Sequence, residues 1–432
     1  MVVELKSEIE EEYKAGDIVN TVGNIIKKVK LDGDIAVQQY EKEFDNVDIS
    51  EFRMEDSTIE QVISKVPDNI KEIIDTNIKR IEAFAKFQFS MYKNMEFITD
   101  NGKTILGQKI LPLDNVGVYI PGGRYPLLST PPMTIIPAKV AGCRRIVACT
   151  PPGENRPNPA TLYGIIKSGA TEVYTIGGAQ AIAAMAYGTE SIKPVNKIAG
   201  PGNAYVNEAK KEVFGKVGID LLAGPSEILV LADETAIEEE VMADLLSQAE
   251  HDPAARCCLV TISPELAHNI YDKMDSYINK LSTKEILKKS WVNHGVIALC
   301  NTLTEAVDYT NNYAAEHLEL HLNETNTEFA FANLTNYGSV FLDHGVPAVF
   351  SDKLLGPNHT LPTLGAAKYS GGLSVGNFLK ILTYSKVTDD NIRDMLAHRV
   401  KIQSDYEGFG AKARSAELRF KENYAKGDIN GR

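Results

Sequence analysis

The chain has few cysteines and no long apolar segment, and both absences limit what it can be. Its five cysteines contain no CxxC pair, and an odd number does not fit a disulfide framework, which favours a reducing environment. No apolar run approaches the roughly 18 residues that a membrane span requires. The N-terminus, MVVELKSEIEEEYKAGD, is too acidic and too polar for a secretory or organellar leader. The sequence therefore predicts a soluble, cytoplasmic protein.

An excess of basic residues is also absent. The 58 acidic residues outnumber the 45 basic residues, and the formal net charge is −13. Nucleic acids and anionic membranes both require a basic face, so we expect neither of them as a partner. The net charge does not restrict the charge of a small-molecule substrate, because that is set by the residues around the binding site.

Short apolar runs that end in glycine or proline dominate the middle of the chain. Runs such as NVGVYIPGG, RRIVACTPPG and TEVYTIGGAQ alternate with helical stretches, and a second set begins with CCLVTI. Repeated strand, turn and helix is typical of a doubly wound parallel sheet, and 432 residues suffice for two or three domains. We therefore expect an α/β fold with two sheets. The helical N-terminal segment should pack on the second sheet, and Asn391–Arg432 should form a polar helical tail.

The segment from Asp220 to Asp252 contains the most distinctive pattern. It passes from a glycine-proline loop through an apolar strand, Glu227–Ala232, into an acidic helix that ends in Gln248-Ala-Glu-His251. Residues three apart on a helix lie on one face, so the Gln248 amide oxygen and the His251 imidazole can bind one ligand. Such donors suit zinc or manganese. The same pair is compatible with a polar helix end that meets solvent.

Three glycine loops that follow predicted strands are candidate nucleotide sites. They are Pro121-Gly-Gly, Gly177-Gly178 and Gly200-Pro-Gly202. Glycine lets the backbone approach a pyrophosphate, and the amides at a helix start favour its negative charge. The GxGxxG fingerprint is absent. From the residues alone, these loops are either nucleotide-binding loops or tight turns.

Two further segments contain acid-base groups. Glu316 and His317 are adjacent, and histidine titrates near physiological pH, so the pair could transfer protons in one site. The pair alone is also compatible with a helix terminus at the surface, where histidine is common. Asp352 begins a polar segment, DKLLGPNHTLPT, in which an aspartate is commonly a turn residue.

Together these segments resemble the histidinol dehydrogenase family, whose members are NAD-dependent enzymes that oxidise an amino alcohol to an amino acid in two steps. The segments that carry the resemblance are AGPSE with ADLLSQAEHD, YAAEHLEL and SDKLLGPNH. The resemblance implies two incomplete Rossmann-like parallel-sheet domains in a homodimer. It implies a helical arm (1–20), a first α/β domain with the metal and catalytic residues (21–118 and 228–372), an NAD-binding α/β domain (119–227), and a helical C-terminal tail (373–432) that is swapped in the dimer.

The resemblance also implies roles for individual residues. His317 resembles the base that takes the alcohol proton, and Glu316 resembles the group that activates water for attack on an aldehyde. Three ligands would leave zinc open to the substrate, whose amine it would hold and whose alcohol it would polarise. The other implied positions are the NAD contacts Tyr119, Gln180 and Asn203, the zinc ligands Gln248, His251 and Asp352, and the substrate contacts Ser226, His359 and Glu407.

The tail departs from the family pattern at one position. Family tails read EGxxAH, in which the Glu contacts substrate and the His completes the metal site across the dimer, whereas this chain has Lys412 after Glu407-Gly-Phe-Gly-Ala. A lysine must lose its proton before it can bind a metal, and at neutral pH it is a cation. Either three residues and water hold the metal, or Lys412 faces an anionic group of the substrate, or the chain only binds ligands.

The substrate has two alternatives. Histidinol, oxidised to histidine, is the default, because most of the motifs are shared with the biosynthetic enzymes. However, PGGRYPLLS, LTNYGSVFL and KYSGGLSVGNFLKILTY resemble paralogues that oxidise sulfopropanediol. A lysine that faces a sulfonate or carboxylate is chemically reasonable, so a sulfonated or otherwise acidic diol is the alternative.

Overall fold

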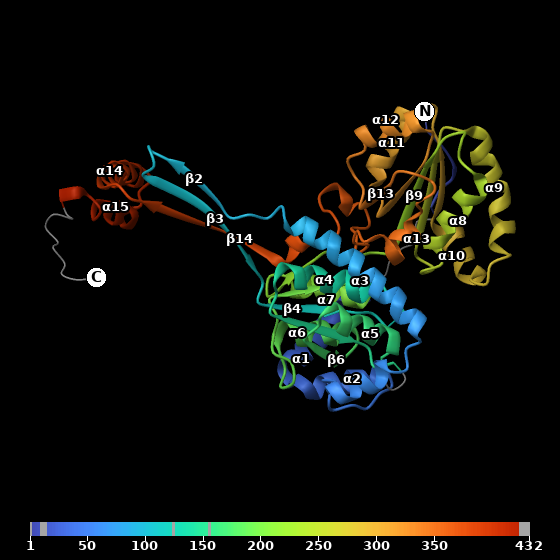
Figure 1. Cartoon of the computed structure of the whole chain (residues 1–432), viewed down its shortest axis with the longest axis horizontal. Coiled ribbons are helices and arrows are strands. Elements are labelled where there is room, and N and C mark those ends of the chain that lie inside the picture. Colours follow the sequence, from blue (N-terminus) through green and yellow to red (C-terminus); the bar gives the residue numbers. More distant parts are fainter. Residues whose placement is uncertain (1, 9–14, 123–125, 154–156, 423–432) are drawn as a thin grey trace. The chain divides into compact units, whose positions relative to one another are not determined.

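The computed structural model describes residues 2–8, 15–122, 126–153 and 157–422. It divides into two compact units, whose elements are labelled in Figure 1. The large unit comprises the residues up to Phe89 together with Leu113–Phe378, and the small unit comprises Ser90–Pro112 together with the residues from Leu379 onward. The predicted α/β fold class is confirmed. Among the described residues, every helix is too short or too polar to cross a lipid bilayer.

The first sheet of the large unit has five parallel strands in the order β6-β5-β4-β7-β8. The chain starts at the central strand and adds strands outward on both sides, which is the Rossmann-type order. Its elements are β4 (Asn115–Tyr119), α4 (Thr130–Ala141), β5 (Arg145–Thr150), α5 (Pro159–Ser168), β6 (Glu172–Thr175), α6 (Gly178–Tyr187), β7 (Lys197–Ala199), α7 (Ala204–Val213) and β8 (Gly218–Ile219).

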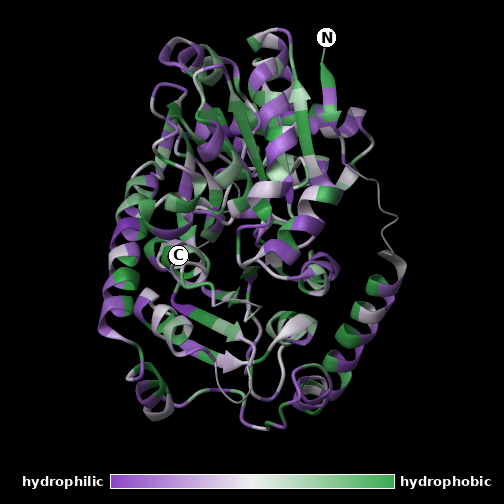
Figure 2. Ribbon diagram, turned by 90° about the vertical axis from the view of Figure 1, so that its right-hand side faces the viewer, coloured by the Kyte–Doolittle hydropathy of each residue, from purple (hydrophilic) through white to green (hydrophobic). Residues whose placement is uncertain are grey.

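Three N-terminal helices, α1 (Ala15–Phe44), α2 (Asp56–Ile63) and α3 (Asp68–Phe89), pack on this five-stranded domain. α1 contacts α6 and α7, and α3 contacts α4 and α5, so the prediction that these helices pack on the second sheet is wrong. Hydrophobic and hydrophilic residues alternate along α1 (Figure 2). Its apolar residues, among them Val22 and Ile25, share one core with the alanine-rich α6, a match that periodicity alone does not reveal.

The second sheet of the large unit has six strands in the order β1-β11-β10-β9-β12-β13. The last five are parallel and repeat the strand order of the first sheet, whereas β1 is an antiparallel edge strand. β1 (Val3–Lys6) falls in the predicted helical arm, but its β-branched start favours a strand, and β11 offers an open edge. The other strands are β9 (Glu227–Ala232), β10 (Arg256–Thr261), β11 (Gly295–Leu299), β12 (His317–His321) and β13 (Ser339–Phe341).

Helices surround this six-stranded sheet, and short helical turns follow its last strand. The helices are α8 (Glu238–Ala249), α9 (Pro264–Ile278), α10 (Lys284–His294), α11 (Leu303–Tyr313), α12 (Glu324–Asn333) and α13 (Ala348–Phe350). The turns are a π-helical turn (Ser351–Leu355) and two 3-10 turns (Ala366–Lys368 and Val375–Phe378).

The small unit is an antiparallel sheet of β14 (Leu379–Val387), β3 (Thr104–Pro112) and β2 (Met95–Thr99), followed by α14 (Asp390–Tyr406) and α15 (Gly410–Glu417). The two helices agree with the predicted helical tail from Asn391. β14, in contrast, is a strand within the segment predicted to be helical. It pairs along its full length with β3, a partner almost 300 residues away along the chain, and periodicity within one segment cannot anticipate this pairing.

Candidate active site and cofactor pocket

Glu316 and His317 lie at the amino end of β12, and the start of the neighbouring strand β9 holds both of them. The amide nitrogen of Glu227 donates to Glu316 Oε2 across 2.9 Å. The carbonyl oxygen of Glu227 lies 3.2 Å from His317 Nδ1, which must therefore carry a proton. Both residues are more than 90% buried. The pair opens an interior strand, so the alternative of a helix terminus at the surface is excluded.

Burial and charge set the protonation of this pair. Burial raises the pKa of Glu316 to about 7, although His317 and the Glu227 amide act against it. Burial lowers the pKa of His317, but Glu316 and Asp352 outweigh that effect and raise it to about 9. His317 Nε2 lies 3.5 Å from Asp352 Oδ1 and makes no hydrogen bond with the described residues. This nitrogen is therefore available to exchange a proton with a ligand.

Gln248, His251 and Asp352 converge at the carboxyl-terminal end of α8. Gln248 is in the last turn of the helix, but His251 lies two residues beyond its end, so the prediction that both are on the helix is wrong for His251. Gln248 Nε2 donates to Asp352 Oδ2 across 3.1 Å. The other amide atom, Gln248 Oε1, is buried without a hydrogen-bond partner among the described residues. A buried acceptor without a donor is the feature that a metal ion would complete.

The charge states of these residues also suit a divalent cation. Burial raises the pKa of Asp352, but His317 and His359 outweigh burial and hold it well below its usual range. Burial lowers the pKa of His251, and the positive charges of Lys353 and His317 act in the same direction. The site thus offers an ionised carboxylate, a neutral imidazole and a free amide oxygen. Zinc binds such donors in proteins, and the family to which the motifs point uses a metal.

Two predicted substrate contacts border the same site. Ser226 Oγ lies 3.5 Å from His251 Nδ1, and His359 Nδ1 lies 3.3 Å from Asp352 Oδ1. The segment that contains His359 is tied to the five-stranded domain, because Asn358 Nδ2 donates to the carbonyl of Met133 in α4 across 2.6 Å.

The remaining predicted residues, Glu407 and Lys412, belong to the small unit. There, Glu407 accepts a hydrogen bond from Gln403, and Lys412 Nζ lies 4.0 Å from the centroid of the Phe409 ring.

A second group of potential metal ligands was not predicted. Asp244 lies on α8, and Glu319 and His321 lie on β12. Their donor atoms lie within 4.8 Å of one another, and all three side chains are buried. His321 Nε2 is 3.3 Å from Asp244 and 3.4 Å from Glu319. Burial lowers the pKa of His321, but the two carboxylates outweigh it and raise the pKa to about 9. At neutral pH the imidazolium itself therefore supplies the cation between these carboxylates.

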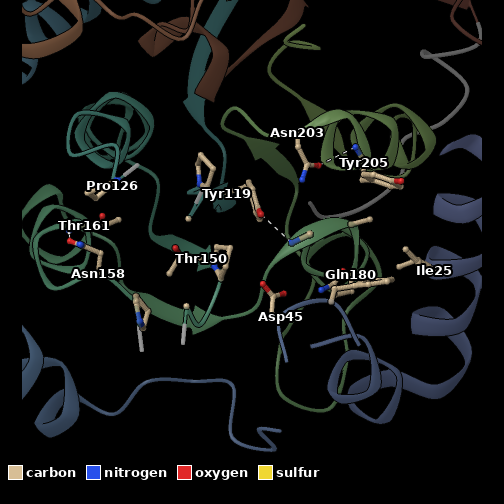
Figure 3. Close-up of a pocket in the computed structure, with 18 of the residues that line it drawn as sticks. Ile25, Asp45, Tyr119, Pro126, Thr150, Asn158, Thr161, Gln180, Asn203 and Tyr205 are labelled. Atoms are coloured by element: carbon tan, nitrogen blue, oxygen red, sulfur yellow. Dashed lines mark hydrogen bonds between the residues drawn. The ribbon is translucent and has the colours of Figure 1, made fainter. Parts of the chain in front are cut away.

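Tyr119, Gln180 and Asn203 line one pocket of about 1190 Å³ (Figure 3). Tyr119 ends β4, Gln180 lies in the first turn of α6 after β6, and Asn203 precedes α7 after β7. The pocket therefore opens at the carboxyl ends of the strands, beside the point where the strand order reverses, which is the usual ligand position in such sheets. The structure thus brings the three predicted cofactor residues together.

Hydrogen bonds and an ion pair fix the walls of this pocket. The Tyr119 hydroxyl accepts from the amide of Gly178, and Asn203 Oδ1 caps α7 by accepting from the amides of Tyr205 and Val206. Behind them, Lys210 Nζ lies 2.5 Å from Asp220 Oδ1, and both side chains are fully buried. The ion pair holds the loop at the backbone of Gly200. Lys210 donates to the carbonyl of Gly200, and Asp220 accepts from its amide.

Two acidic residues of the N-terminal segment, which were not predicted as site residues, also reach the pocket region. Asp45 lines the pocket (Figure 3). Glu41 is fully buried behind it and accepts from the Gly177 amide (3.0 Å) and from Gln180 Nε2 (2.8 Å). They lie more than 70 residues before the first glycine loop, in a stretch predicted to be helical that contains no motif. No local sequence signal therefore marks them as pocket residues. Glu227 was also missed, although it adjoins Ser226 in AGPSE.

Comparison with known proteins identifies the family of this chain. The sequence model of the family described as histidinol dehydrogenase matches residues 9–420. A histidinol dehydrogenase homolog of Shouchella clausii is 41% identical over 96% of this chain and 97% of its own length. The histidinol dehydrogenase of Bacillus cereus is 41% identical over 94% and 93%. The crystal structure of histidinol dehydrogenase from Elizabethkingia anophelis matches with a TM-score of 0.87 and 34% identity, over 96% of this chain and 94% of that one. The chain therefore belongs to the histidinol dehydrogenase family of NAD-dependent oxidoreductases.

Proposed function

We propose that this chain oxidises the primary alcohol of L-histidinol to the carboxylate of L-histidine in two NAD-dependent steps, with a bound aldehyde between them. The observation that best supports this proposal is the convergence of an acid-base pair with a set of metal donors. His317 Nε2 and the Gln248 Nε2 amide both lie against the carboxylate of Asp352, and His317 Nε2 and Gln248 Oε1 have no hydrogen-bond partner among the described residues. A site with an acceptor for a cation and a separate proton carrier suits the oxidation of an alcohol.

The residues divide the chemistry between them. Glu316 and Asp352 favour the protonated form of His317, so Nε2 must first release its proton, and it then receives the proton of the alcohol. The Nδ1–H stays bound to the Glu227 carbonyl, which keeps the ring in one orientation. Glu316, with a pKa of about 7, takes a proton from the water that attacks the aldehyde. NAD, held in the pocket of Tyr119, Gln180 and Asn203, would supply the hydride acceptor for both steps. Zinc, held by Gln248, His251 and Asp352, would orient the amine and polarise the alcohol.

The stoichiometry of the reaction tests this proposal. Each alcohol should yield two NADH, and no free aldehyde should accumulate during turnover. One NADH per alcohol, with free aldehyde in the solution, would contradict the two-step reaction. Failure to oxidise any of a panel of histidinol, sulfopropanediol and other polar diols would favour a non-catalytic binding protein on the same scaffold.

We also propose that the protein is a homodimer in which the small unit packs against a second copy. The small unit has few buried apolar residues among those described, and it exposes many large ones. Examples on its sheet and helices are Met95, Phe97, Ile98, Ile381, Ile402 and Tyr406. Apolar surface of this extent is uncommon on a monomer. Sedimentation velocity would test the proposal, and a monomer at micromolar concentration would contradict it.

A second candidate substrate, an acidic or sulfonated diol, is favoured by Lys412 and by the segments PGGRYPLLS, LTNYGSVFL and KYSGGLSVGNFLKILTY, which resemble sulfopropanediol-oxidising paralogues. Lys412 stands where the sequence pattern of the family has a histidine ligand, and its ammonium group is a cation at neutral pH. The variant Lys412→His separates the two candidates. A gain of histidinol oxidation with tighter zinc binding would indicate a lost ligand. A loss of activity on an acidic diol would indicate that Lys412 binds the anionic group of the substrate.

A further inference from the structure

We infer that Asp45 and Gln180 bind the ribose hydroxyls of the adenosine half of the dinucleotide and thereby select NAD over NADP. This inference rests on the proposed cofactor pocket and adds the basis of its selectivity. Asp45 is the only residue with a charged side chain among the described residues that line the pocket. It belongs to the segment that follows α1, which packs on the five-stranded domain.

Both side chains present hydrogen-bond acceptors at the start of α6. A Cβ atom on Gly177 would lie 3.0 Å from Asp45 Oδ2, and a Cβ atom on Gly178 would lie 2.6 Å from Gln180 Oε1. The two acceptors thus lie against consecutive residues. Gln180 is fully buried. Its Nε2 donates to Glu41, whereas its Oε1 has no partner among the described residues. The Asp45 carboxylate likewise accepts no hydrogen bond from the part of the chain that the structure describes.

A ligand at this wall must donate hydrogen bonds. A ribose diol supplies two hydroxyl donors, whereas a 2′-phosphate supplies only acceptors and negative charge at neutral pH. Asp45 would repel such a phosphate. An acidic residue on the ribose hydroxyls is the usual means by which a Rossmann-type domain binds NAD, whereas NADP requires an arginine.

The start of α6 is also closed to the phosphates of the dinucleotide. A helix start commonly binds phosphate through its free amides. Here the amide of Gly177 donates to Glu41, and the amide of Gly178 donates to the Tyr119 hydroxyl. Because two amides are occupied and a carboxylate lies beside them, this wall suits a sugar rather than a diphosphate.

The packing of the helices indicates which ribose lies here. The segment of Asp352 and His359 lies against α3 and α4, whereas α1 and α6 pack on each other and on α7. Gly224 is tied to the catalytic half, since its amide donates to Thr363 Oγ1. The reacting nicotinamide must approach the catalytic half, and the adenosine then takes the far side, where Asp45 lies.

The test compares NAD and NADP with the full-length protein, by calorimetric titration and by kcat/KM with the alcohol substrate. The variants are Asp45→Asn and Asp45→Ser, and thermal unfolding verifies that each is folded. We expect the wild type to prefer NAD. Each variant should bind NAD about tenfold more weakly and should bind NADP more tightly. The matched control is Asp48→Asn, which removes the same charge from an exposed residue three positions along, outside the pocket lining.

The outcomes separate this inference from the proposal on which it rests. A preference for NAD that falls by tenfold or more in both Asp45 variants, but not in Asp48→Asn, supports the inference. A parallel loss of NAD and NADP binding, or an unchanged ratio, overturns it while the cofactor pocket stands. A wild type that binds neither dinucleotide by calorimetry overturns the pocket assignment and this inference together.

Discussion

The backbone amide of Glu227 donates to the carboxylate of Glu316 across 2.9 Å, at the point where two parallel strands begin side by side. The carbonyl of the same residue binds His317, the next residue in the chain. In the register of β9 and β12, His317 is the partner of Ile228. Strand pairing therefore sets the orientation of the acid-base pair, and the side chain of Glu227 contributes nothing to these two bonds.

Replacement of His317 and replacement of Glu316 should affect different steps of the reaction. His317→Asn removes the proton acceptor of the alcohol and should lower kcat by about 100-fold or more. Glu316→Gln retains an oxygen that can accept from the Glu227 amide, but it cannot take a proton from water. This variant should release aldehyde and yield closer to one NADH per alcohol. NADH counting with an aldehyde trap measures both effects, and an unchanged stoichiometry in Glu316→Gln would refute its role in the second step.

Removal of the metal should reduce both activity and stability. Dialysis against a chelator should abolish turnover and lower the thermal midpoint, and added zinc should restore both. A ligand at about 100 times its Kd stabilises a folded protein by about 2.7 kcal/mol. Gln248→Ala should lose most of the zinc-induced shift, whereas Gln38→Ala, which changes a glutamine of α1, should retain it. An equal shift in both variants would show that Gln248 is not a ligand.

The buried ion pair beneath the Gly200 loop should stabilise both the fold and the pocket. Lys210→Met leaves the carboxylate of Asp220 buried and unpaired, which should cost about 3–5 kcal/mol of unfolding free energy and raise KM for NAD. Lys211→Met, which removes an exposed lysine that pairs with Glu208, should cost less than about 1 kcal/mol. Urea unfolding measures the difference. Equal losses in the two variants would show that the ion pair does not support the loop.

Glu41 should make the stability of the protein decrease with rising pH. Burial raises its pKa from about 4.5 to about 7, although Gln180 and the Gly177 amide oppose this. Between these values the folded state binds a proton that the unfolded state has released, so stability falls as pH rises and changes little above about pH 7. The interval corresponds to about 3 kcal/mol.

The variant Glu41→Gln isolates this contribution. Its amide oxygen can still accept from Gly177 and Gln180, and it has no charge to bury. At about pH 8 the variant should be more stable than the wild type, and the difference should become small at about pH 5. Urea unfolding at both pH values gives the comparison. A variant that is less stable than the wild type at the higher pH would mean that the ionised carboxylate is favourable in this environment.

The sequence predicted the features that short, recognisable segments specify. These are the Rossmann-type strands of the large unit and five site residues, which the structure brings together: Gln248, His251, Asp352, Glu316 and His317. Asp45 and Glu41 could not be predicted, since only tertiary packing carries α1 to α6. Glu227 acts through peptide atoms, which every residue except proline supplies. The strands of the small unit were missed because β14 pairs with β3, a segment far away along the chain, and local periodicity does not indicate such a partner.

The candidate functional residues lie at opposite ends of the strands in the two sheets of the large unit. The candidate cofactor pocket lies at the carboxyl ends of the five-stranded sheet, whereas Glu316, His317 and Glu227 lie at the amino ends of strands in the six-stranded sheet. Except for the segment after Phe341, which carries Asp352 and His359, the connections at the carboxyl edge of that second sheet, such as the segment after Leu299, hold none of the proposed ligands, bases or substrate contacts. Such connections are the natural places to insert an epitope or a fluorescent label without disturbing turnover.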